Sequence, residues 1–438
     1  MHPESVSLPV VRTLPNGVRL LAVPIPHVQS ASVGVFLRVG SRDETPDNNG
    51  IGHVLEHMAF KGTATRTVQE INLDAERLGA DVNAFTSKDT TGYFMTGLGR
   101  HVEQFLAMTA DIVLNSTFPE AELARELEVI RQEAIEYDED PEESSSELLD
   151  RALWGDHPMG MPVIGTVRNI ERFTRDELVA HVRQHYVAGK AVVAAAGHID
   201  VEAFFAQAAA LFSAMPDGAA PPTGHPAAPA YVGDAVGRRF SQVSQVFVNL
   251  AYPVAPPQPL DPGDPRWRHA SALAAMLFGG GMSAPFTDII RERLGLAYTA
   301  HSTTESGEAW SNFIVHAITT PDKLERMMTS TGELLRSHAG AIDPVHLERA
   351  KNQLIVARVR SAERTYAIME RAVEELFVRG TVSTTGDTVA MIESITADEV
   401  RAVFERALRH PPALAITGKG ATAKAARELA QALRAASQ

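Results

Sequence analysis

The sequence predicts an α+β fold built from two homologous halves, each a mostly antiparallel sheet with helices packed on one face. Segments with strand periodicity alternate with segments with helical periodicity throughout the chain. A Pro/Ala-rich stretch lies at mid-chain, and sequence that precedes it recurs after it. A chain of 438 residues is also too long for one ordinary core. We therefore expect a first half at 1–215, a linker at 216–230 and a second half at 231–438.

The first half begins with strand patterns, continues with helices and ends on a buried strand. The expected strands are 18–23 and 32–40, which read as an antiparallel pair, then 81–88, 91–96 and 191–197. The expected helices are 50–60, 67–78, 101–114, 120 to about 137, and 175–185. An acidic stretch, 136–147, ends the fourth of these helices and is expected to be solvated.

Two segments of the first half return in the second. Residues 118–125 resemble 342–349, and residues 170–178 resemble 392–400. Each copy of the second segment is followed by a helix and by an apolar strand that ends in glycine. The two halves are therefore predicted to be copies of one structural unit.

Composition narrows the class of protein. The chain has no cysteine, so a metal site would have to use nitrogen and oxygen ligands. A net charge of −14 argues against nucleic acid as a partner. No apolar run is long enough to span a membrane, and the first residues lack the pattern of a signal peptide. We expect a soluble, cytoplasmic protein without a membrane partner.

The stretch His53-Val54-Leu55-Glu56-His57 contains candidate metal ligands and a candidate general base. Positions i and i+4 of a helix lie on the same face, so His53 and His57 can both present a ring nitrogen to one metal ion. Zinc accepts such ligands, and a catalytic zinc site uses three protein ligands. If Glu56 is the base that takes a proton from water, the third ligand must come from elsewhere. A His/Glu/His set also arises by chance, so an independent observation is needed.

The repeat supplies that observation, because its copies differ where chemistry is suspected. The predicted helix at 267–278 contains no His/Glu/His set. Placing residue 118 on residue 342 puts Glu126 and Glu133 on Ala350 and Ala357. Carboxylates needed only for packing would have no reason to disappear together with the histidines. The first half is therefore expected to carry the metal and the second half to lack it.

The inverted motif His53-x-x-Glu56-His57, followed at a long separation by Glu133, resembles the pitrilysin and mitochondrial-processing-peptidase family of zinc peptidases, the inverzincins. The resemblance covers essentially the whole chain. It implies one Zn²⁺ per chain, held by His53, His57 and Glu133, with Glu126 helping to keep the ligands in their orientation. It also implies that Glu56 is the general base that acts on zinc-bound water.

Further matches concern the substrate. Asn83, Ala84 and Phe85 resemble the family's edge strand, to which a peptide adds as an extra strand, although an ordinary strand would look the same. Arg291 and Tyr298 resemble a pair in the second half that binds the substrate and stabilises the oxyanion. Without the family, Arg291 would be interpreted as a solvated helix residue.

The chain also departs from the family pattern. After the turn at 279–283 it reads Ala284-Pro285-Phe286-Thr287, where a small polar residue, arginine, leucine and phenylalanine are usual. The spacing from this turn to Arg291 is kept, so we expect the proline to alter local geometry rather than function.

The resemblance implies a zinc metalloendopeptidase that cleaves peptides or unfolded protein segments in a closed dimer chamber. Because one chain carries both the zinc set and the Arg/Tyr pair, a homodimer is expected, and a heterodimer with a metal-less homologue is the main alternative. Another alternative is a silent structural subunit of the same fold, although such subunits usually lose their ligands. A thermolysin-like enzyme is disfavoured because its motif has the opposite order.

Overall fold

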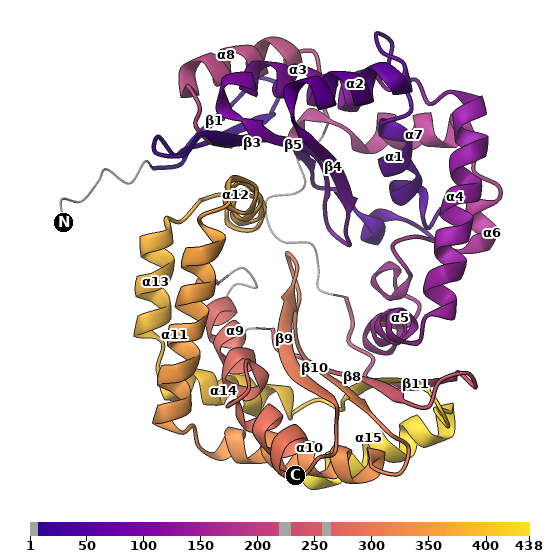
Figure 1. Cartoon of the computed structure of the whole chain (residues 1–438), viewed down its shortest axis with the longest axis vertical. Helices are drawn as coiled ribbons and strands as arrows, with labels where there is room; N and C mark the ends of the chain where they lie inside the picture. Colours follow the sequence, from indigo (N-terminus) through magenta and orange to yellow (C-terminus); the bar gives the residue numbers. More distant parts are fainter. Residues whose placement is uncertain (1–7, 219–228, 256–263) are drawn as a thin grey trace. The chain divides into compact units, whose positions relative to one another are not determined.

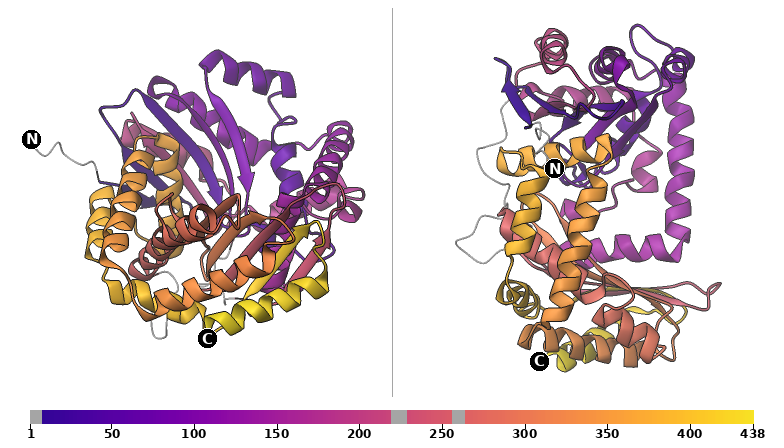
Figure 2. Two further views of the ribbon diagram at one scale, coloured as in Figure 1. Left: turned by 60° about the horizontal axis from the view of Figure 1, so that its bottom comes forward. Right: turned by 60° about the vertical axis from the view of Figure 1, so that its left-hand side comes forward.

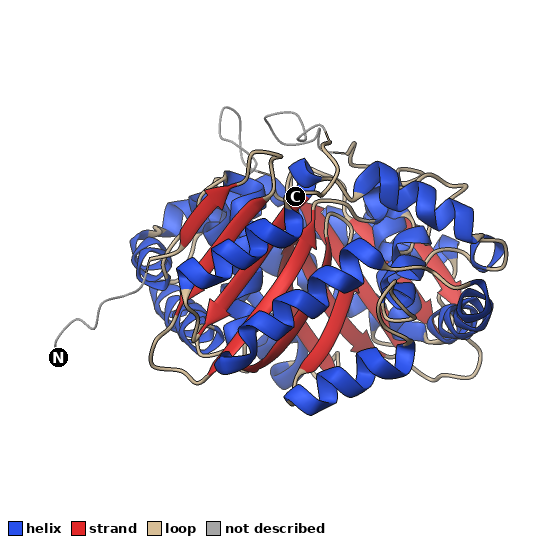
Figure 3. Ribbon diagram, turned by 90° about the horizontal axis from the view of Figure 1, so that it is seen from above, coloured by secondary structure: helices blue, strands red, loops and turns tan. Residues whose placement is uncertain are grey.

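The computed structural model describes residues 8–218, 229–255 and 264–438. The chain forms two compact units (Figure 1). Unit 1 comprises residues 1–134, 162–224 and 359–385, and unit 2 comprises residues 135–161, 225–358 and 386–438. Each unit is a mixed, mostly antiparallel sheet with helices packed against it, as Figure 3 shows with strands in red and helices in blue. The predicted α+β class is thus confirmed.

The sheet of unit 1 has six strands in the order β1-β2-β6-β3-β5-β4. Their bounds are β1 Val10–Thr13, β2 Arg19–Pro24, β3 Ser30–Leu37, β4 Asp81–Thr86, β5 Thr91–Leu98 and β6 Ala191–Gly197. Strand β6 is buried along its whole length, lies parallel to β2 and antiparallel to β3, and so separates the two. The expected direct pairing of β2 with β3 is therefore wrong. Strand β2 instead forms a hairpin with β1 through the turn at Asn16-Gly17.

Helices of unit 1 lie on both faces of this sheet. They are α1 Ile51–Ala59, α2 Val68–Leu78, α3 Val102–Asn115, α4 Glu120–Glu139 (of which residues up to 134 belong to unit 1), α6 Val167–Ile170, α7 Arg175–His185, α8 Val201–Phe212 and α12 Thr365–Arg379, with the 3₁₀ turns η1 Ser41–Asp43, η2 Gly99–His101 and η4 Ala188–Lys190. Helices α3 and α8 share one apolar core with the strands, and α12 shares a second core on the opposite face (Figure 2).

Unit 2 repeats the plan with five strands in the order β7-β11-β8-β10-β9. The strands are β7 Ala235–Arg239, β8 Val246–Pro253, β9 Thr299–Ser306, β10 Ser311–Thr319 and β11 Ala413–Gly418. The helices are α5 Pro141–Trp154, α9 Pro265–Gly279, α10 Leu324–Gly340, α11 Pro344–Ser361, α13 Thr385–Ser394, α14 Ala397–Ala407 and α15 Ala423–Ser437, with the 3₁₀ turn η3 Pro158–Gly160 and the π-helical segment η5 Thr287–Arg293.

The two units correspond in the pairing of their central strands. In both sheets a fully buried strand from the end of the repeat, β6 or β11, pairs in parallel with an early strand, β2 or β7. The preceding helix in each copy begins with a capping box, Thr174 with Glu177 in α7 and Thr396 with Glu399 in α14. These pairs occupy matching positions of the sequence repeat, so the predicted homology of the halves is confirmed.

Each unit also contains a helix that comes from the other half of the sequence. Helix α12 comes from the second half of the sequence but packs on the sheet of unit 1, where the Thr365 hydroxyl lies 2.8 Å from the Ser32 hydroxyl. Helix α5 comes from the first half but packs on the sheet of unit 2. The prediction of helices on one face only is therefore wrong for unit 1, whose sheet is covered on both faces. The predicted linker, 216–230, lies mostly outside the described residues.

Among the described residues, no helix combines the length and the apolar character that crossing a membrane requires.

Candidate metal centre

The helix with the histidines, α1, is fixed by its apolar side and by its first turn. Ile51, Val54, Leu55 and Met58 are buried in a core with residues of α4 and α7, which leaves His53, Glu56 and His57 on the remaining faces. The predicted helix at 50–60 is confirmed as Ile51–Ala59.

A buried carboxylate holds the start of this helix. Glu44 is only 3% exposed, and its two oxygens accept hydrogen bonds from the backbone N–H groups of Gly50 (2.8 Å) and Gly52 (2.9 Å) and from the Asn49 side chain (3.0 Å). Burial raises the pKa of Glu44 to about 7, against the opposing effect of these donors. A Cβ on Gly52 would lie 3.0 Å from a Glu44 oxygen, so glycine permits the close approach. Glu44 thereby fixes the residue next to His53.

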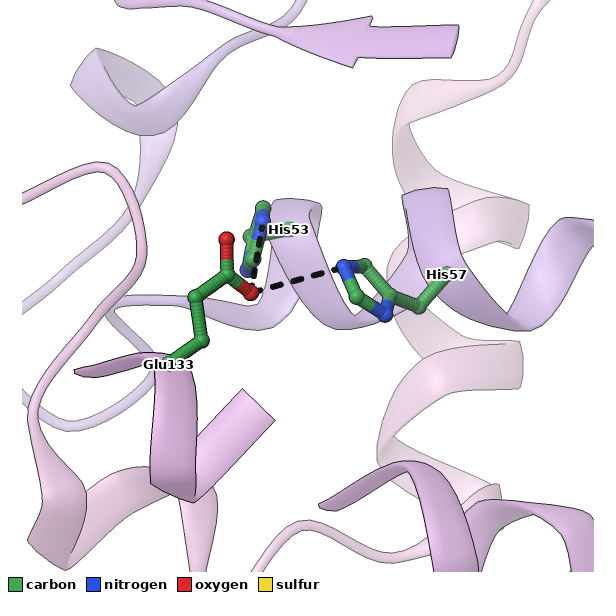
Figure 4. A group of neighbouring side chains, drawn as sticks. All are labelled: His53, His57 and Glu133. Atoms are coloured by element: carbon green, nitrogen blue, oxygen red, sulfur yellow. Dashed lines mark ion pairs between the residues drawn. The ribbon is translucent and has the colours of Figure 1, made fainter. Parts of the chain in front are cut away.

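The structure brings His53, His57 and Glu133 together (Figure 4). One oxygen of Glu133, Oε2, lies 3.9 Å from His53 Nε2 and 3.7 Å from His57 Nε2. These distances are too long for direct hydrogen bonds. Bonds of about 2.0–2.1 Å to a tetrahedral zinc ion would place its ligand atoms roughly 3.3 Å apart. The three ligand atoms all lie within 4.8 Å of one another, so modest side-chain movements would bring them around a zinc ion, and they form the one such group found among the described residues.

The electrostatics of the histidines also suit a metal. Burial, and secondly the neighbouring His57, lower the pKa of His53 to about 4. His53 is therefore neutral near neutral pH, which is the form that binds metal ions. Its other ring nitrogen, Nδ1, is buried and has no hydrogen-bond partner.

Glu126 lies behind His57. Its Oε2 is 3.2 Å from His57 Nδ1, and its Oε1 is 2.7 Å from Lys61 Nζ. A carboxylate that accepts from the second ring nitrogen of a ligand histidine fixes the tautomer and the orientation of the ring. Helix α4 thus supplies Glu126 and Glu133, which are two turns apart on the same side.

Glu56 lies on α1 between the two histidines but outside the group that meets Glu133. Burial raises the pKa of Glu56 and the nearby Glu133 carboxylate acts in the same direction, while Thr86 and His57 oppose the shift. A carboxylate with a raised pKa is suited to take up and release a proton.

The predicted substrate residues are on β4, which is an edge strand of its sheet. Asn83 Oδ1 accepts a hydrogen bond from Ala84 N (2.8 Å), and the Phe85 ring packs against Phe36. Strand β4 also contacts α1. An edge strand beside the metal group is therefore present in unit 1.

Arg291 and Tyr298 belong to unit 2 and are both accessible. Arg291 lies in the π-helical segment η5, where it contacts Met282 Sδ (3.5 Å) and Glu292 (3.4 Å), and Tyr298 is 76% exposed. The unusual Ala284-Pro285-Phe286 sequence packs inward, with Ala284 and Phe286 fully buried. The structure places this pair and the metal group in different units.

The counterparts of the carboxylates in unit 2 are apolar. Ala350 is fully buried in α11, and Ala357 is on the same helix.

Sequence reasoning missed Glu44, Lys61 and Thr86 as neighbours of the centre. Glu44 is in a loop and Thr86 ends a strand, so no helical spacing connects them to the motif.

Comparisons with known proteins agree with this centre. The family model described as Insulinase (Peptidase family M16) matches residues 19–167, and the model described as Peptidase M16 inactive domain matches residues 172–354. An uncharacterized zinc protease from Rickettsia bellii (strain RML369-C) is 33% identical over 346 residues, which are 78% of this chain and 81% of that protein. One from Mycobacterium tuberculosis (strain ATCC 25618 / H37Rv) is 32% identical over 441 residues, covering 99% and 98%.

Solved structures have the same fold. The peptidase M16 inactive domain from Pseudomonas fluorescens has a TM-score of 0.83 and 22% identity, with 94% of this chain and 99% of that chain covered. A chain of complex III2 from Candida albicans, with Inz-5 bound, has a TM-score of 0.81 and 16% identity, with 97% and 99% covered.

Proposed function

The chain belongs to the insulinase family of peptidases (peptidase family M16), and from that premise we propose that it is a zinc-dependent endopeptidase acting on peptides and on unfolded or flexible protein segments. The single observation that carries the proposal is the meeting of His53, His57 and Glu133 around a space that fits zinc. Relatives named zinc proteases support the choice of metal.

His53, His57 and Glu133 would hold the ion, and Glu126 would orient the His57 ring through Nδ1. When bound there, zinc would supply Lewis acidity toward the scissile carbonyl and toward a water molecule. Glu56 takes the proton of the attacking water and passes it to the leaving amine, so that the amide bond is replaced by a carboxyl group and a free amine.

The substrate lies along β4 in this proposal. An extended peptide adds to the sheet edge through main-chain hydrogen bonds near Asn83, Ala84 and Phe85. Such binding selects segments without fixed structure, since the substrate must present an extended stretch of free backbone N–H and C=O groups to the strand. Arg291 holds the substrate main chain and Tyr298 donates to the oxyanion, a role supported by the exposure of the tyrosine.

The proposed oligomeric state follows from the site residues that one chain contains. Because each chain has both the metal group and the Arg291/Tyr298 pair, a homodimer supplies every residue of the mechanism. Size-exclusion chromatography of the lone chain, with peptide cleavage measured in each fraction, separates this assembly from a heterodimer. Cleavage that appears only after a second, different chain is added would establish the heterodimer.

The proposal is tested by incubating the purified chain with a mixed peptide library and identifying the products by mass spectrometry. We expect internal cleavage that stops when a chelator removes the metal and returns when zinc is added back. A zinc-loaded chain that cleaves no peptide would contradict the proposal and favour a structural subunit.

A further inference from the structure

In unit 2, an arginine from a neighbouring helix binds the end of α9. Helices α9 and α11 lie side by side (Figure 1), and residues of both belong to one apolar core. The Arg349 guanidinium on α11 donates to Met276 O (3.2 Å) and to Leu277 O (2.8 Å) of α9. It also donates to Gly280 O (2.5 Å), just beyond the helix. Helix α9 has no basic residue in its own last turn, so Arg349 supplies the positive charge that a helix C-terminus favours.

The same side chain borders the turn that follows α9, residues 279–283. Arg349 Nη1 donates to Gln353 Oε1 (2.6 Å), one helical turn further along α11. A Cβ on Gly281 would lie 2.8 Å from Gln353 Nε2 and 3.7 Å from Arg349 Nη1. Gly281 has a φ of +96°, which glycine adopts without strain. The backbone of the turn therefore lies directly against these two side chains of α11, and they determine its course.

The turn in its own right contacts Arg291, the residue proposed to hold the substrate. Ala284 N donates to Gly281 O (3.1 Å), which closes the turn just before the segment η5. Arg291 Nη1 lies 3.5 Å from the sulfur of Met282, within the turn. The ion pair of Arg291 with Glu292 involves its own neighbour in the sequence. The position of the turn therefore affects where the Arg291 side chain lies.

Tyr298 is held by a different element. Its N–H donates to Ile318 O of β10 (2.8 Å), and the hydroxyl of Thr319, the next residue of that strand, donates to Leu296 O (2.5 Å). Strand β10 rather than the turn therefore fixes the backbone of the proposed oxyanion donor. A displacement of the turn would move Arg291 and leave Tyr298 in place.

The arginine at the matching position of unit 1 has another role. The sequence repeat puts Arg125 of α4 at the position of Arg349. The Arg125 side chain is 68% exposed and pairs with Glu122 on its own helix. Helix α4 instead contacts α1 through Glu126 and Glu133. The contact of the arginine with a turn is therefore a feature of unit 2 and not a requirement of the fold that both halves share.

We propose that Arg349, together with Gln353, is a positioning residue that fixes the 279–283 turn and, through it, the Arg291 side chain. The inference rests on the proposed function, since it takes Arg291 as the residue that holds the substrate main chain. Binding that is equally strong in the ground state and the transition state lowers KM without changing kcat. Arg349 therefore contributes to substrate affinity, whereas the chemical step depends on groups that Arg349 does not contact.

The test compares Arg349→Met, which keeps an unbranched side chain but removes its charge and its donors, with Lys351→Met. Lys351 is two residues away on α11 and also donates to a backbone oxygen, Glu393 O (2.7 Å), so its loss controls for a general disturbance of the helix. Arg349→Lys keeps the charge without the planar fork of donors. Arg349→Met is also made in an Arg291→Met background. For each variant, kcat, KM, zinc content and the urea midpoint are measured with one peptide substrate identified for the wild type.

For Arg349→Met we expect KM to rise about 5- to 10-fold while kcat stays within about twofold of the wild type. Arg349→Lys should raise KM about threefold, and Lys351→Met should leave it unchanged. Zinc content should not change, because the metal group belongs to unit 1.

The Arg291→Met background separates positioning from a merely structural role. There, Arg349→Met should raise KM by less than about twofold, because the effects of residues that act through one another do not add. A structural residue would lower the urea midpoint and would have its full effect on KM in either background.

Several results would overturn the inference. A wild-type KM in Arg349→Met, or an equal rise of KM in Lys351→Met, would show that Arg349 does not act on the turn. A full further rise of KM in the Arg291→Met background would show that it acts through another group. If Arg349→Met does not fold, a wild-type KM in Arg349→Lys would be decisive in the same way. A zinc-loaded wild type without peptidase activity would remove the proposed function and the inference with it, whereas an active wild type beside an unaffected Arg349→Met would remove the inference alone.

Discussion

Replacing Glu126 with glutamine should weaken zinc binding while the fold stays intact. Glu126 Oε2 lies 3.2 Å from His57 Nδ1, and the side chain is only 12% exposed, so water screens the interaction weakly. Glutamine keeps the size and an acceptor oxygen but removes the charge. A hydrogen bond to a charged group contributes about 1.5–3 kcal/mol. Since 1.4 kcal/mol is a factor of ten, the dissociation constant for zinc should rise about 10- to 100-fold.

The assay is a competition between the protein and a chromophoric chelator of known zinc affinity. Glu128→Gln is the matched control, because Glu128 is on the same helix but 60% exposed and paired with Arg131. Lys61→Gln separates the two partners of Glu126, since it removes the ion pair with Oε1 and leaves the contact with His57. Equal zinc affinities for Glu126→Gln and Glu128→Gln would refute the view that Glu126 orients His57. A loss of the same size in Lys61→Gln would assign the effect to the ion pair.

Three further predictions concern stability and substrate handling. Burial, and then the charges of His185 and Lys190, lower the pKa of His181 to about 3. Below about pH 6.5 the unfolded chain therefore binds a proton at this residue that the folded chain does not bind, and the free energy of unfolding should fall with decreasing pH by up to about 1.4 kcal/mol per pH unit. His181→Gln should reduce that slope, measured by urea denaturation at a series of pH values. Asp111 Oδ2 accepts hydrogen bonds from Thr63 (2.7 Å), Thr65 (2.8 Å) and Arg66 (2.6 Å), so Asp111→Ala should lower the free energy of unfolding by about 2–4 kcal/mol, and a change near zero in urea denaturation would contradict this. Tyr298→Phe should lower kcat about 100-fold in steady-state peptide cleavage with unchanged zinc content, and full activity would exclude the hydroxyl as an oxyanion donor.

Local spacing made the metal group predictable from the sequence. His53 and His57 are one helical turn apart, and Glu126 and Glu133 are two turns apart on another helix, so each pair shares a face of its helix. The resemblance to a known family connected the two helices, and the structure brings them to within 4 Å of each other at Glu133. The second half has Ala350 and Ala357 at the positions of Glu126 and Glu133 in the repeat, and this difference between the two halves also supported the prediction.

The pairing of β2 with β6 could not be predicted in the same way. In the sequence, β3, β4 and β5 all come between β2 and β6, yet in the sheet β6 lies between β2 and β3. Periodicity identifies a strand and its buried faces but contains no information about its neighbour in the sheet. The apolar sequence of β6 indicated only that this strand would be central.

The exchanged helices escaped prediction for a related reason. Helix α5 has exposed acidic residues at its start, as expected for the acidic stretch, but buries Leu149, Leu153 and Trp154 further on. Helix α12 buries Ile368 and Met369 against unit 1. An amphipathic pattern shows that a helix has an apolar side, but it does not show which sheet that side covers.

The most direct test of the account is the zinc content of Glu56→Gln and His57→Ala, measured by atomic emission together with peptide cleavage. We expect Glu56→Gln to retain one zinc ion per chain and to lose cleavage, because glutamine cannot accept the proton while all three ligands remain. His57→Ala should lose both, because one of the three ligands is gone. A Glu56→Gln protein without zinc, or a His57→Ala protein with a full complement of zinc, would contradict the assignment of base and ligands.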